Sequence, residues 1–188
     1  MSAEFETEAL IHLDALYRTA LRLTGRREEA EEVVQDTFLK AFRFWENYQQ
    51  GTNCRAWLYR ILHTTFATRY QKDKRRPPTV ELDEQNAWLG PEDERLGMDA
   101  DSWGELLSRA VEDDVLHALE ALPVPYRMVV LLSDLEGMPY KEIAQVMEVP
   151  VGTVMSRLHR GRRALREQLA GAARRYGIGP QRGREGEA

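Results

Sequence analysis

The chain has 188 residues, 43% of them hydrophobic, which is enough for one medium domain or two small ones with buried cores. No apolar run approaches the roughly 20 residues needed to cross a bilayer, and the acidic start "MSAEFETEAL" is unlike a secretory signal, so we expect a cytoplasmic protein without membrane insertion. A single cysteine, Cys54, and four histidines without zinc-ligand spacing predict no disulfide, no metal site and no cofactor.

The net charge of −5 is unevenly distributed along the chain. Residues 1–76 carry 13 basic and 11 acidic side chains, residues 77–112 carry 2 and 10, and residues 113–188 carry 11 and 10. The middle segment mixes glycine, proline, aspartate and glutamate with weak periodicity, which is typical of a flexible linker. We therefore predict two small domains, 1–76 and 113–172, joined by an acidic linker at 77–112, with a disordered tail at 173–188.

The first domain contains three helical patterns. Apolar residues recur at helical spacing from Leu10 to Leu23 and stop at Gly25. A second pattern runs for about five turns from Ala30 to Tyr48, and a third covers 54–74. We expect three helices here.

The second of these helices has an unusual polar face. Opposite its apolar side lie Glu32, Gln35, Asp36 and Arg43, which surround an outward Leu39. A lone exposed leucine is ordinary in soluble proteins. An apolar anchor with a polar rim is also the composition of a protein docking surface, and the pattern alone leaves both interpretations open.

The third helix has apolar or aromatic residues on two sides. One side carries Tyr59, His63, Phe66 and Tyr70 and ends near Lys74, and the other carries Trp57, Leu58, Ile61 and Leu62. Both sides could be core in a helical bundle. Alternatively, part of the aromatic stripe stacks on unpaired bases, which contributes roughly 1–3 kcal/mol per base, while nearby cations hold the nucleic-acid backbone.

The C-terminal domain is predicted to contain four short helices. Their sequences are "DDVLHALEALP", "PYRMVVLLSDLEG", "PYKEIAQVMEV" and "PVGTVMSRLHRGRRALREQL". No convincing period-two strand pattern occurs anywhere in the chain. The fold class is therefore expected to be all-α.

The last helix has two distinct faces. From Thr153 to Arg166 it holds five arginines and no acid. Val154, Leu158, Gly161, Leu165 and Leu169 share one side, and Thr153, Ser156, Arg157, Arg160 and Arg163 share the other, while Arg162 and Arg166 point toward the flank.

The preceding short helix can pack Ile143, Ala144 and either Val146 or Met147 against the apolar side, which makes a helix-turn-helix. The second helix of that motif enters the DNA major groove, where arginine binds guanine edges or phosphates. Arginines that are merely solvated are the alternative interpretation.

Two blocks carry a family resemblance. The block "EEAEEVVQDTFLKAFRFWENYQQGTNCRAWLYRIL" resembles region 2 of bacterial extracytoplasmic-function (ECF) RNA polymerase sigma factors of the sigma-70 family. The block "LPVPYRMVVLLSDLEGMPYKEIAQVMEVPVGTVMSRLHRGRRALREQL" resembles their region 4. The resemblance implies an alternative sigma factor that is not an enzyme, that directs core RNA polymerase to specific promoters, and that is a monomer when free.

The resemblance also implies roles for matching positions. The β′ clamp helices of core polymerase would be bound by Glu32, Gln35, Asp36, Leu39 and Arg43. The minus-ten element would be bound by Asn53, at the position that captures a flipped base, and by Trp57, Tyr59, Arg60, His63, Phe66, Tyr70 and Lys74. The minus-thirty-five element would be bound by Thr153, Ser156, Arg157, Arg160, Arg162 and Arg163. Region 4 would also bind the β flap, and the linker would lead toward the RNA exit path.

Two positions depart from the family pattern. Glu148 stands where the family often has a turn glycine, and Pro150 stands where a serine or threonine often caps the recognition helix. Within the family, "GTN.RAWLYRIL" with "PVGTVMSRLHRGRR" looks most like the group that answers thiol-oxidative stress under a zinc-binding anti-sigma factor. An anti-sigma factor is therefore an expected partner.

Two other function classes account for less of the sequence. A stand-alone dimeric helix-turn-helix regulator would explain the C-terminal domain, but it leaves the outward Leu39 face and the aromatic helix without a role. A helical enzyme is disfavoured because no cysteine, histidine or carboxylate cluster with catalytic spacing is present in the sequence.

Overall fold

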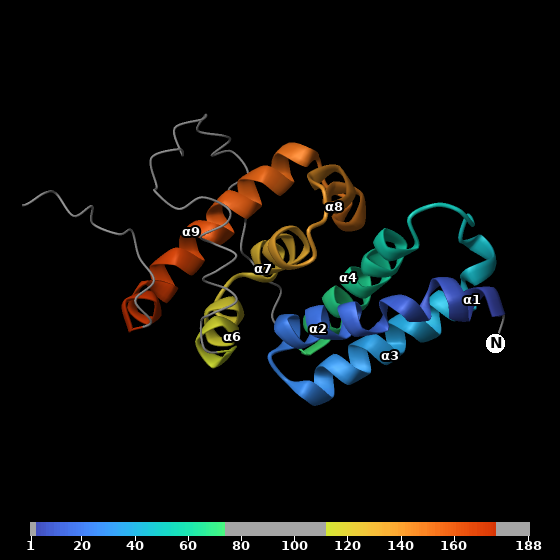
Figure 1. The fold of residues 1–188 in the computed structure, drawn as a ribbon, viewed down its shortest axis with the longest axis horizontal. Coiled ribbons are helices and arrows are strands. Elements are labelled where there is room, and N and C mark those ends of the chain that lie inside the picture. The colour runs from blue at the N-terminus through green and yellow to red at the C-terminus, as the bar shows by residue number, and fades with distance from the viewer. Residues whose placement is uncertain (1–2, 74–111, 176–188) are drawn as a thin grey trace, which may run out of the picture.

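The computed structural model of the chain describes residues 3–73 and 112–175, and within these ranges it is helical without any strand (Figure 1). The N-terminal bundle comprises α1 (Ala3–Glu8), α2 (Leu13–Thr24), α3 (Arg27–Arg43) and α4 (Cys54–Asp73), with 3₁₀ turns at Leu10–His12 and Trp45–Asn47. The C-terminal unit comprises α6 (Glu112–Glu120), α7 (Val124–Val130), a π turn at Leu131–Leu135, α8 (Tyr140–Met147) and α9 (Val151–Arg175). The predicted all-α class is confirmed.

The helix predicted to stop at Gly25 ends there. Gly25 has a φ of +69°, a conformation that glycine adopts without steric cost, and its N–H donates to the Leu21 carbonyl at 2.8 Å. The chain then reverses into α3, so that Leu16, Ala20 and Leu23 pack in the same core as Ala30.

The pattern expected to give one helix from 30 to 48 is interrupted. Helix α3 ends at Arg43. Trp45 and Tyr48 follow in a short turn, where their rings stack with centroids 4.8 Å apart. Phe5 of α1, a helix that the sequence did not predict, meets Trp45 edge-on at 5.0 Å and is 2% exposed. The apolar pattern continues past the end of α3 because Trp45 and Tyr48, although they lie in the turn that follows, are also buried in the core.

The C-terminal unit contains the predicted short helices with two changes. The chain that starts at Pro123 is helical through Val130 and then widens into the π turn, which ends just before Gly137 with its φ of +61°. Helix α9 continues to Arg175, three residues into the segment expected to be a tail. Lys74, the linker residues 77–111 and the tail residues 176–188 lie outside the described residues.

Helices α8 and α9 form the predicted helix-turn-helix. Ile143, Ala144, Val146 and Met147 of α8 and Val154 and Leu158 of α9 are all buried, and the two helices pack together. Gly161 lets α9 approach α7 closely, because a Cβ atom there would lie 2.8 Å from Val130 Cγ2.

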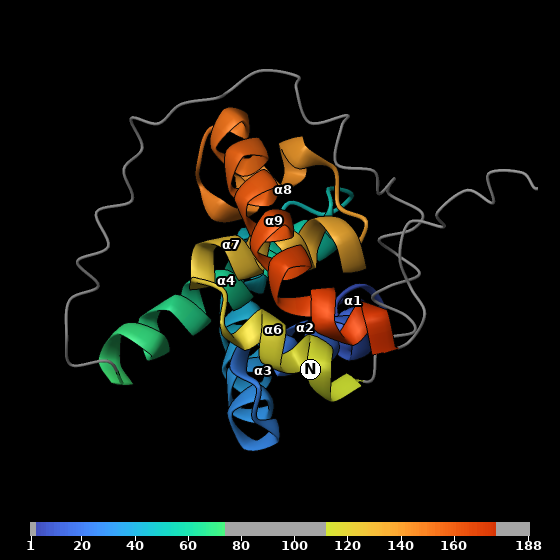
Figure 2. The ribbon, with the colours of Figure 1, turned by 90° about the vertical axis from the view of Figure 1, so that its left-hand side faces the viewer.

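The N-terminal bundle and the C-terminal unit are in contact. Helix α4 packs beside α8, and α2 packs beside α6 (Figures 1 and 2). Arg127, 7% exposed, donates to the carbonyl of Leu23 at the end of α2, to that of Glu120 at the end of α6 and to that of Leu122 just after it. Burial lowers the pKa of Arg127, but helix C-terminal ends carry partial negative charge and favour a cation at this position. No helix in the described ranges is long and apolar enough to span a membrane.

Glu148 holds the turn between α8 and α9 in a conformation that favours glycine, with φ 55° and ψ 43°. We predict that Glu148→Gly is more stable to urea than Glu148→Ala by about 1 kcal/mol, because both variants lose the carboxylate but only glycine relieves the backbone. The matched control is the exposed helical position Gln145, where Ala should be more stable than Gly by about 0.5–1 kcal/mol. Equal stability of the two Glu148 variants would show that the turn is unstrained.

Candidate polymerase and nucleic-acid interfaces

The outward face of α3 is arranged as the sequence predicted. Leu39 is 59% exposed, and Gln35 and Arg43 beside it are also exposed. Phe42 near the end of α3 and Phe44 just after it are also about half exposed. Leu39 is therefore one of several exposed apolar side chains in this part of the chain.

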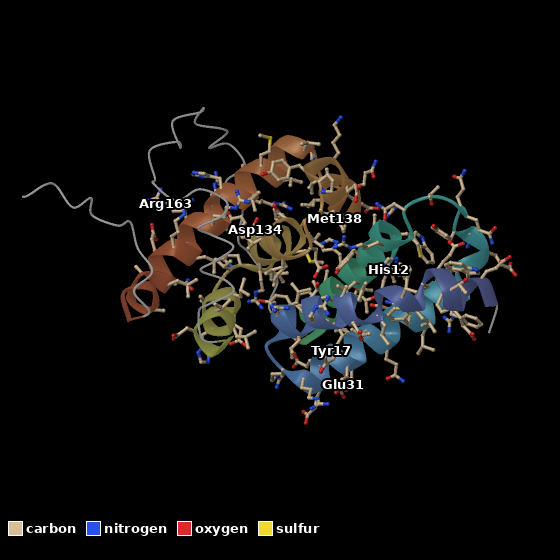
Figure 3. All side chains as sticks on the ribbon, in the orientation of Figure 1. His12, Tyr17, Glu31, Asp134, Met138 and Arg163 are labelled. Atoms are coloured by element: carbon tan, nitrogen blue, oxygen red, sulfur yellow. The ribbon has the colours of Figure 1, made fainter. Side chains whose placement is uncertain are left out.

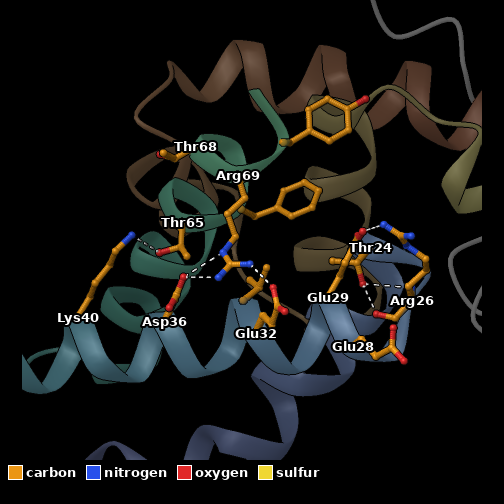
Figure 4. A pocket seen from close by; sticks show the side chains of 13 residues that line it. Thr24, Arg26, Glu28, Glu29, Glu32, Asp36, Lys40, Thr65, Thr68 and Arg69 are labelled. Carbon is orange, nitrogen blue, oxygen red and sulfur yellow. Dashed lines mark hydrogen bonds and ion pairs between the residues drawn. The ribbon is translucent and has the colours of Figure 1, made fainter. Parts of the chain in front are cut away.

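The acids on this face are held by a residue that the sequence reasoning missed. Arg69 of α4 binds Glu32 through Nη1 at 2.6 Å and Asp36 through Nη2 at 2.6 Å and Nε at 2.9 Å (Figure 4). These hydrogen bonds, chiefly the one with Asp36, raise the pKa of Arg69. The (i, i+4) spacing of Glu32 and Asp36 was a signal for a shared cation, but nothing local indicated that α4 supplies it.

A second polar contact joins α3 to α4. Lys40 donates to the Thr65 hydroxyl at 3.0 Å. This contact and the Arg69 ion pairs line a groove between the two helices (Figure 4). The orientation of the Leu39 face is thus fixed by polar contacts to α4 as well as by the core.

The aromatic stripe of α4 is largely interior in this structure. Tyr59 is fully buried and Phe66 is 5% exposed, while Trp57, His63 and Tyr70 are partly buried. The Tyr59 hydroxyl lies 3.2 Å from Thr19 Oγ1, and burial raises its pKa. In this conformation the core interpretation therefore describes Tyr59 and Phe66.

Asn53 and Arg60 remain at the surface but have partners. Asn53 Oδ1 accepts from the Ala56 N–H at 3.0 Å, which caps α4, and its Nδ2 donates to Glu142 at 2.9 Å. Arg60 pairs with Glu148. Arg55, which the sequence did not single out, pairs with Glu136 at 2.8 Å.

The arginine helix α9 presents its side chains to different surroundings. Arg157 and Arg160 are half buried, and Arg160 lies 3.5 Å from the Tyr126 hydroxyl. Arg163 is exposed and pairs with Glu167 one turn further along the helix, on the outer side in Figure 3. Ser156 donates to the carbonyl of Thr153 at 3.1 Å.

Arg162 has an inward partner. Its Nη2 and Nε donate to the two oxygens of Asp134 at 2.6 and 3.1 Å, and the Asp134 side chain is only 4% exposed. These hydrogen bonds raise the pKa of Arg162. Its charge is already compensated within the C-terminal unit, whereas Arg163 one residue later faces solvent.

No cluster of histidine, cysteine and acidic residues in ranges 3–73 and 112–175 is placed to hold a metal ion. Cys54 is buried at the start of α4, and burial raises the pKa of its thiol to about 11.

Comparisons with known families match both units. Residues 10–76 match the family "Sigma-70 region 2", and residues 112–165 match "Sigma-70, region 4". The ECF RNA polymerase sigma factor SigE of Mycolicibacterium smegmatis is 35% identical over 170 residues, which cover 85% of this chain and 59% of that protein. The ECF RNA polymerase sigma-E factor of Escherichia coli is 33% identical over 147 residues, which cover 78% of this chain and 77% of that one.

Solved structures give the same likeness. The sigma factor RpoE of Bartonella quintana, crystallised with the anti-sigma factor NepR, is 27% identical, covers 89% of this chain and 97% of its own, and has a TM-score of 0.67. CnrH in complex with the cytosolic domain of CnrY, at 24% identity and a TM-score of 0.60, covers 89% of this chain and 88% of its own and shares the fold.

Arg162 and Arg163 offer a matched test of their different surroundings. Arg162→Ala should lower the free energy of unfolding by about 2 kcal/mol, because it leaves a buried Asp134 carboxylate without its cation. Arg163→Ala should change it by less than about 0.5 kcal/mol, since that ion pair is exposed. Chemical denaturation of both variants measures the difference, and equal stability would mean that the Asp134 pair contributes nothing.

Proposed function

Because this chain belongs to the ECF RNA polymerase sigma factors of the sigma-70 family, we propose that it binds core RNA polymerase and directs it to specific promoters. The observation that carries the proposal is the combination, on one chain and in family order, of the outward Leu39 face and the arginine-bearing helix-turn-helix. A stand-alone helix-turn-helix regulator would have no use for the first of these surfaces.

Core binding is assigned to the N-terminal domain, 1–76. Leu39 supplies an exposed apolar anchor, and Gln35 and Arg43 supply its polar rim. Glu32 and Asp36 reach the β′ clamp helices only by sharing or exchanging their Arg69 partner. The C-terminal domain, 113–172, would bind the β flap, and the acidic linker, 77–112, would lead toward the RNA exit path.

Recognition of the minus-ten element is assigned to α4 and the loop before it. Asn53 is the proposed base-capturing residue, and Trp57, Arg60, His63, Tyr70 and Lys74 are proposed as further contacts to the same element. Tyr59 and Phe66 were predicted in the same group, but they are buried here and would meet DNA only after a rearrangement of the structure around them. Stacking rewards the melted strand rather than the duplex.

Recognition of the minus-thirty-five element is assigned to α9. Thr153, Ser156, Arg157 and Arg160 lie near the start of the helix that would enter the major groove, and Arg163 lies one turn further along. Arg162 is included in this surface, although its first role in the structure is to pair with Asp134.

An anti-sigma factor is the proposed regulator, since the solved structures of RpoE and CnrH are complexes with an anti-sigma factor and with CnrY, respectively. The finer placement, in the thiol-oxidative-stress group with a zinc-binding anti-sigma factor, rests on the two sequence blocks alone. It is tested by adding such an anti-sigma factor to a transcription assay under reducing and oxidising conditions. A cytoplasmic location follows from the proposed function.

Core binding and transcription test the proposal directly. The purified chain should be retained by bacterial core polymerase and should yield run-off transcripts. Leu39→Ala should weaken core binding by about tenfold, the effect of removing one anchoring side chain. The control, Leu13→Ala, removes a leucine of similar exposure on α2 and should bind normally. Unchanged binding of Leu39→Ala, with helicity intact by circular dichroism, would refute the docking assignment.

The arginines of α9 should separate by role in a promoter-library selection. Arg157→Ala or Arg160→Ala should cost about 1–3 kcal/mol at one promoter position and relax the sequence preference there. Arg166→Ala, toward the flank, should weaken all sequences alike and lower the salt slope by about one. If all three variants keep the parental minus-thirty-five preference, α9 attracts DNA without reading it.

A further inference from the structure

An open hollow lies beside the end of α3 on the N-terminal bundle. It is formed by α1, the last turn of α3 and the turn that follows, which lie together in Figure 1. Its volume is about 570 Å³. Its lining combines three aromatic residues with two acids and one amide, namely Phe42, Trp45, Tyr48, Glu4, Glu46 and Gln50. Apolar rings and carboxylates therefore share one surface.

The rings of the hollow are held in place by one another. Phe5 of α1 meets Phe42 edge-on with ring centroids 5.3 Å apart, and it meets Trp45 in the same way. Trp45 in turn stacks on Tyr48. Trp45 and Tyr48 are buried, whereas Phe42 is 46% exposed and supplies the most accessible ring of the hollow. The aromatic wall is thus formed before a partner arrives, and less conformational entropy is lost on binding.

The two acids of the hollow have no cation of their own. Glu4 accepts a hydrogen bond from the Gln50 amide at 2.8 Å, which leaves the charge of the carboxylate uncompensated. Glu46 is exposed, and neither acid forms an ion pair within the part of the chain that the structure describes. By contrast, the acids on the outward face of α3 share Arg69. The hollow therefore carries negative charge that awaits a cation.

An arginine side chain is the ligand that suits this combination. The face of an aromatic ring attracts a cation within about 6 Å of its centre, and a carboxylate binds the N–H groups of a guanidinium. Arginine does both at once, and it is enriched among the residues that anchor protein interfaces. A phosphate would be repelled by Glu4 and Glu46. The occupant is therefore a protein rather than a nucleic acid.

The hollow continues the Leu39 face. Leu39 and Phe42 are three residues apart on α3, so they are neighbours on the surface of the helix, and both are exposed. A protein that lies along α3 over Leu39 reaches the hollow at the end of the helix. One partner can therefore use both features.

We propose that this hollow binds one arginine side chain of the protein that docks on the Leu39 face, with Glu4 and Glu46 holding the guanidinium and Phe42 lying against it. The inference rests on the proposed function for the identity of that protein, which is core RNA polymerase. The chemistry of the hollow itself depends only on the residues that line it.

A small probe tests the hollow without a partner protein. The probe is N-acetyl-arginine amide, and its control is N-acetyl-citrulline amide, which has nearly the same shape but no charge. Binding is followed by NMR through the indole N–H signal of Trp45, which is assigned with Trp45→Phe. The arginine probe should shift this signal in a saturable manner, and the citrulline probe should not. No shift with the arginine probe, or equal shifts with both probes, would overturn the proposal.

Two pairs of substitutions show whether the acids of the hollow are responsible. Glu4→Gln with Glu46→Gln should abolish the shift caused by the arginine probe. The matched control, Glu6→Gln with Asp14→Asn, removes two exposed acids that do not line the hollow and should retain the shift. A shift that survives equally in both pairs would mean that the arginine binds elsewhere, and the proposal would be wrong.

The same variants are then compared in binding to core polymerase. Glu4→Gln with Glu46→Gln should weaken binding by about tenfold and reduce its dependence on salt, because a charged anchor is lost. Glu6→Gln with Asp14→Asn makes the same change in net charge and should bind like the parent. Circular dichroism checks that both variants keep their helices.

The two measurements separate this inference from the proposed function. A Trp45 shift that requires both glutamates of the hollow, without any retention by core polymerase, would support the arginine site and refute the sigma-factor assignment. Core-dependent transcripts with equal core binding by the two variant pairs would overturn the arginine site and leave the assignment standing.

Discussion

The arrangement of the two units depends on a buried cation. Arg127 belongs to the C-terminal unit, but one of the three carbonyls that accept its hydrogen bonds is Leu23, at the end of α2 in the N-terminal bundle. A guanidinium can be taken out of water only where acceptors replace the water, and the two helix ends provide them. Its Nε finds no acceptor among the described residues, so the site is costly and balanced rather than strongly stabilising.

Helix α4 makes contacts with other elements on each of its sides. Leu58 and Leu62 pack into the bundle, Arg69 fixes the acids of α3, and Arg55 and Arg60 meet the C-terminal unit. A helix with partners all round has no single polar side, which is why its sequence suggested two explanations at once. The core explanation describes Leu58, Leu62, Tyr59 and Phe66, while Arg55 and Arg60 contact the C-terminal unit.

Sequence reasoning succeeded where the signal is local. Gly25 and Gly137 mark helix ends through their positive φ, and the 3.6-residue period placed Val154 and Leu158 against Ile143. It missed α1, whose only strong apolar residue, Phe5, is buried by rings from α3 and the turn after it. It also missed the long-range contacts of Arg69, Arg127 and Glu136, because an ion pair or hydrogen bond between residues dozens of positions apart leaves no periodic trace. The helices and the Leu39 face were predictable; the covering of α4 was not.

The charged residues of the C-terminal unit are divided between two sides. Its glutamates at 136, 142 and 148 lie toward α4, and its arginines lie along α9. Glu148 combines an unfavourable backbone conformation with a favourable ion pair. Glycine would suit the left-handed backbone of this turn better, but only a side chain with a carboxylate can pair with Arg60. The residue that stands in place of glycine in the turn between α8 and α9 is thus one that contacts the N-terminal bundle.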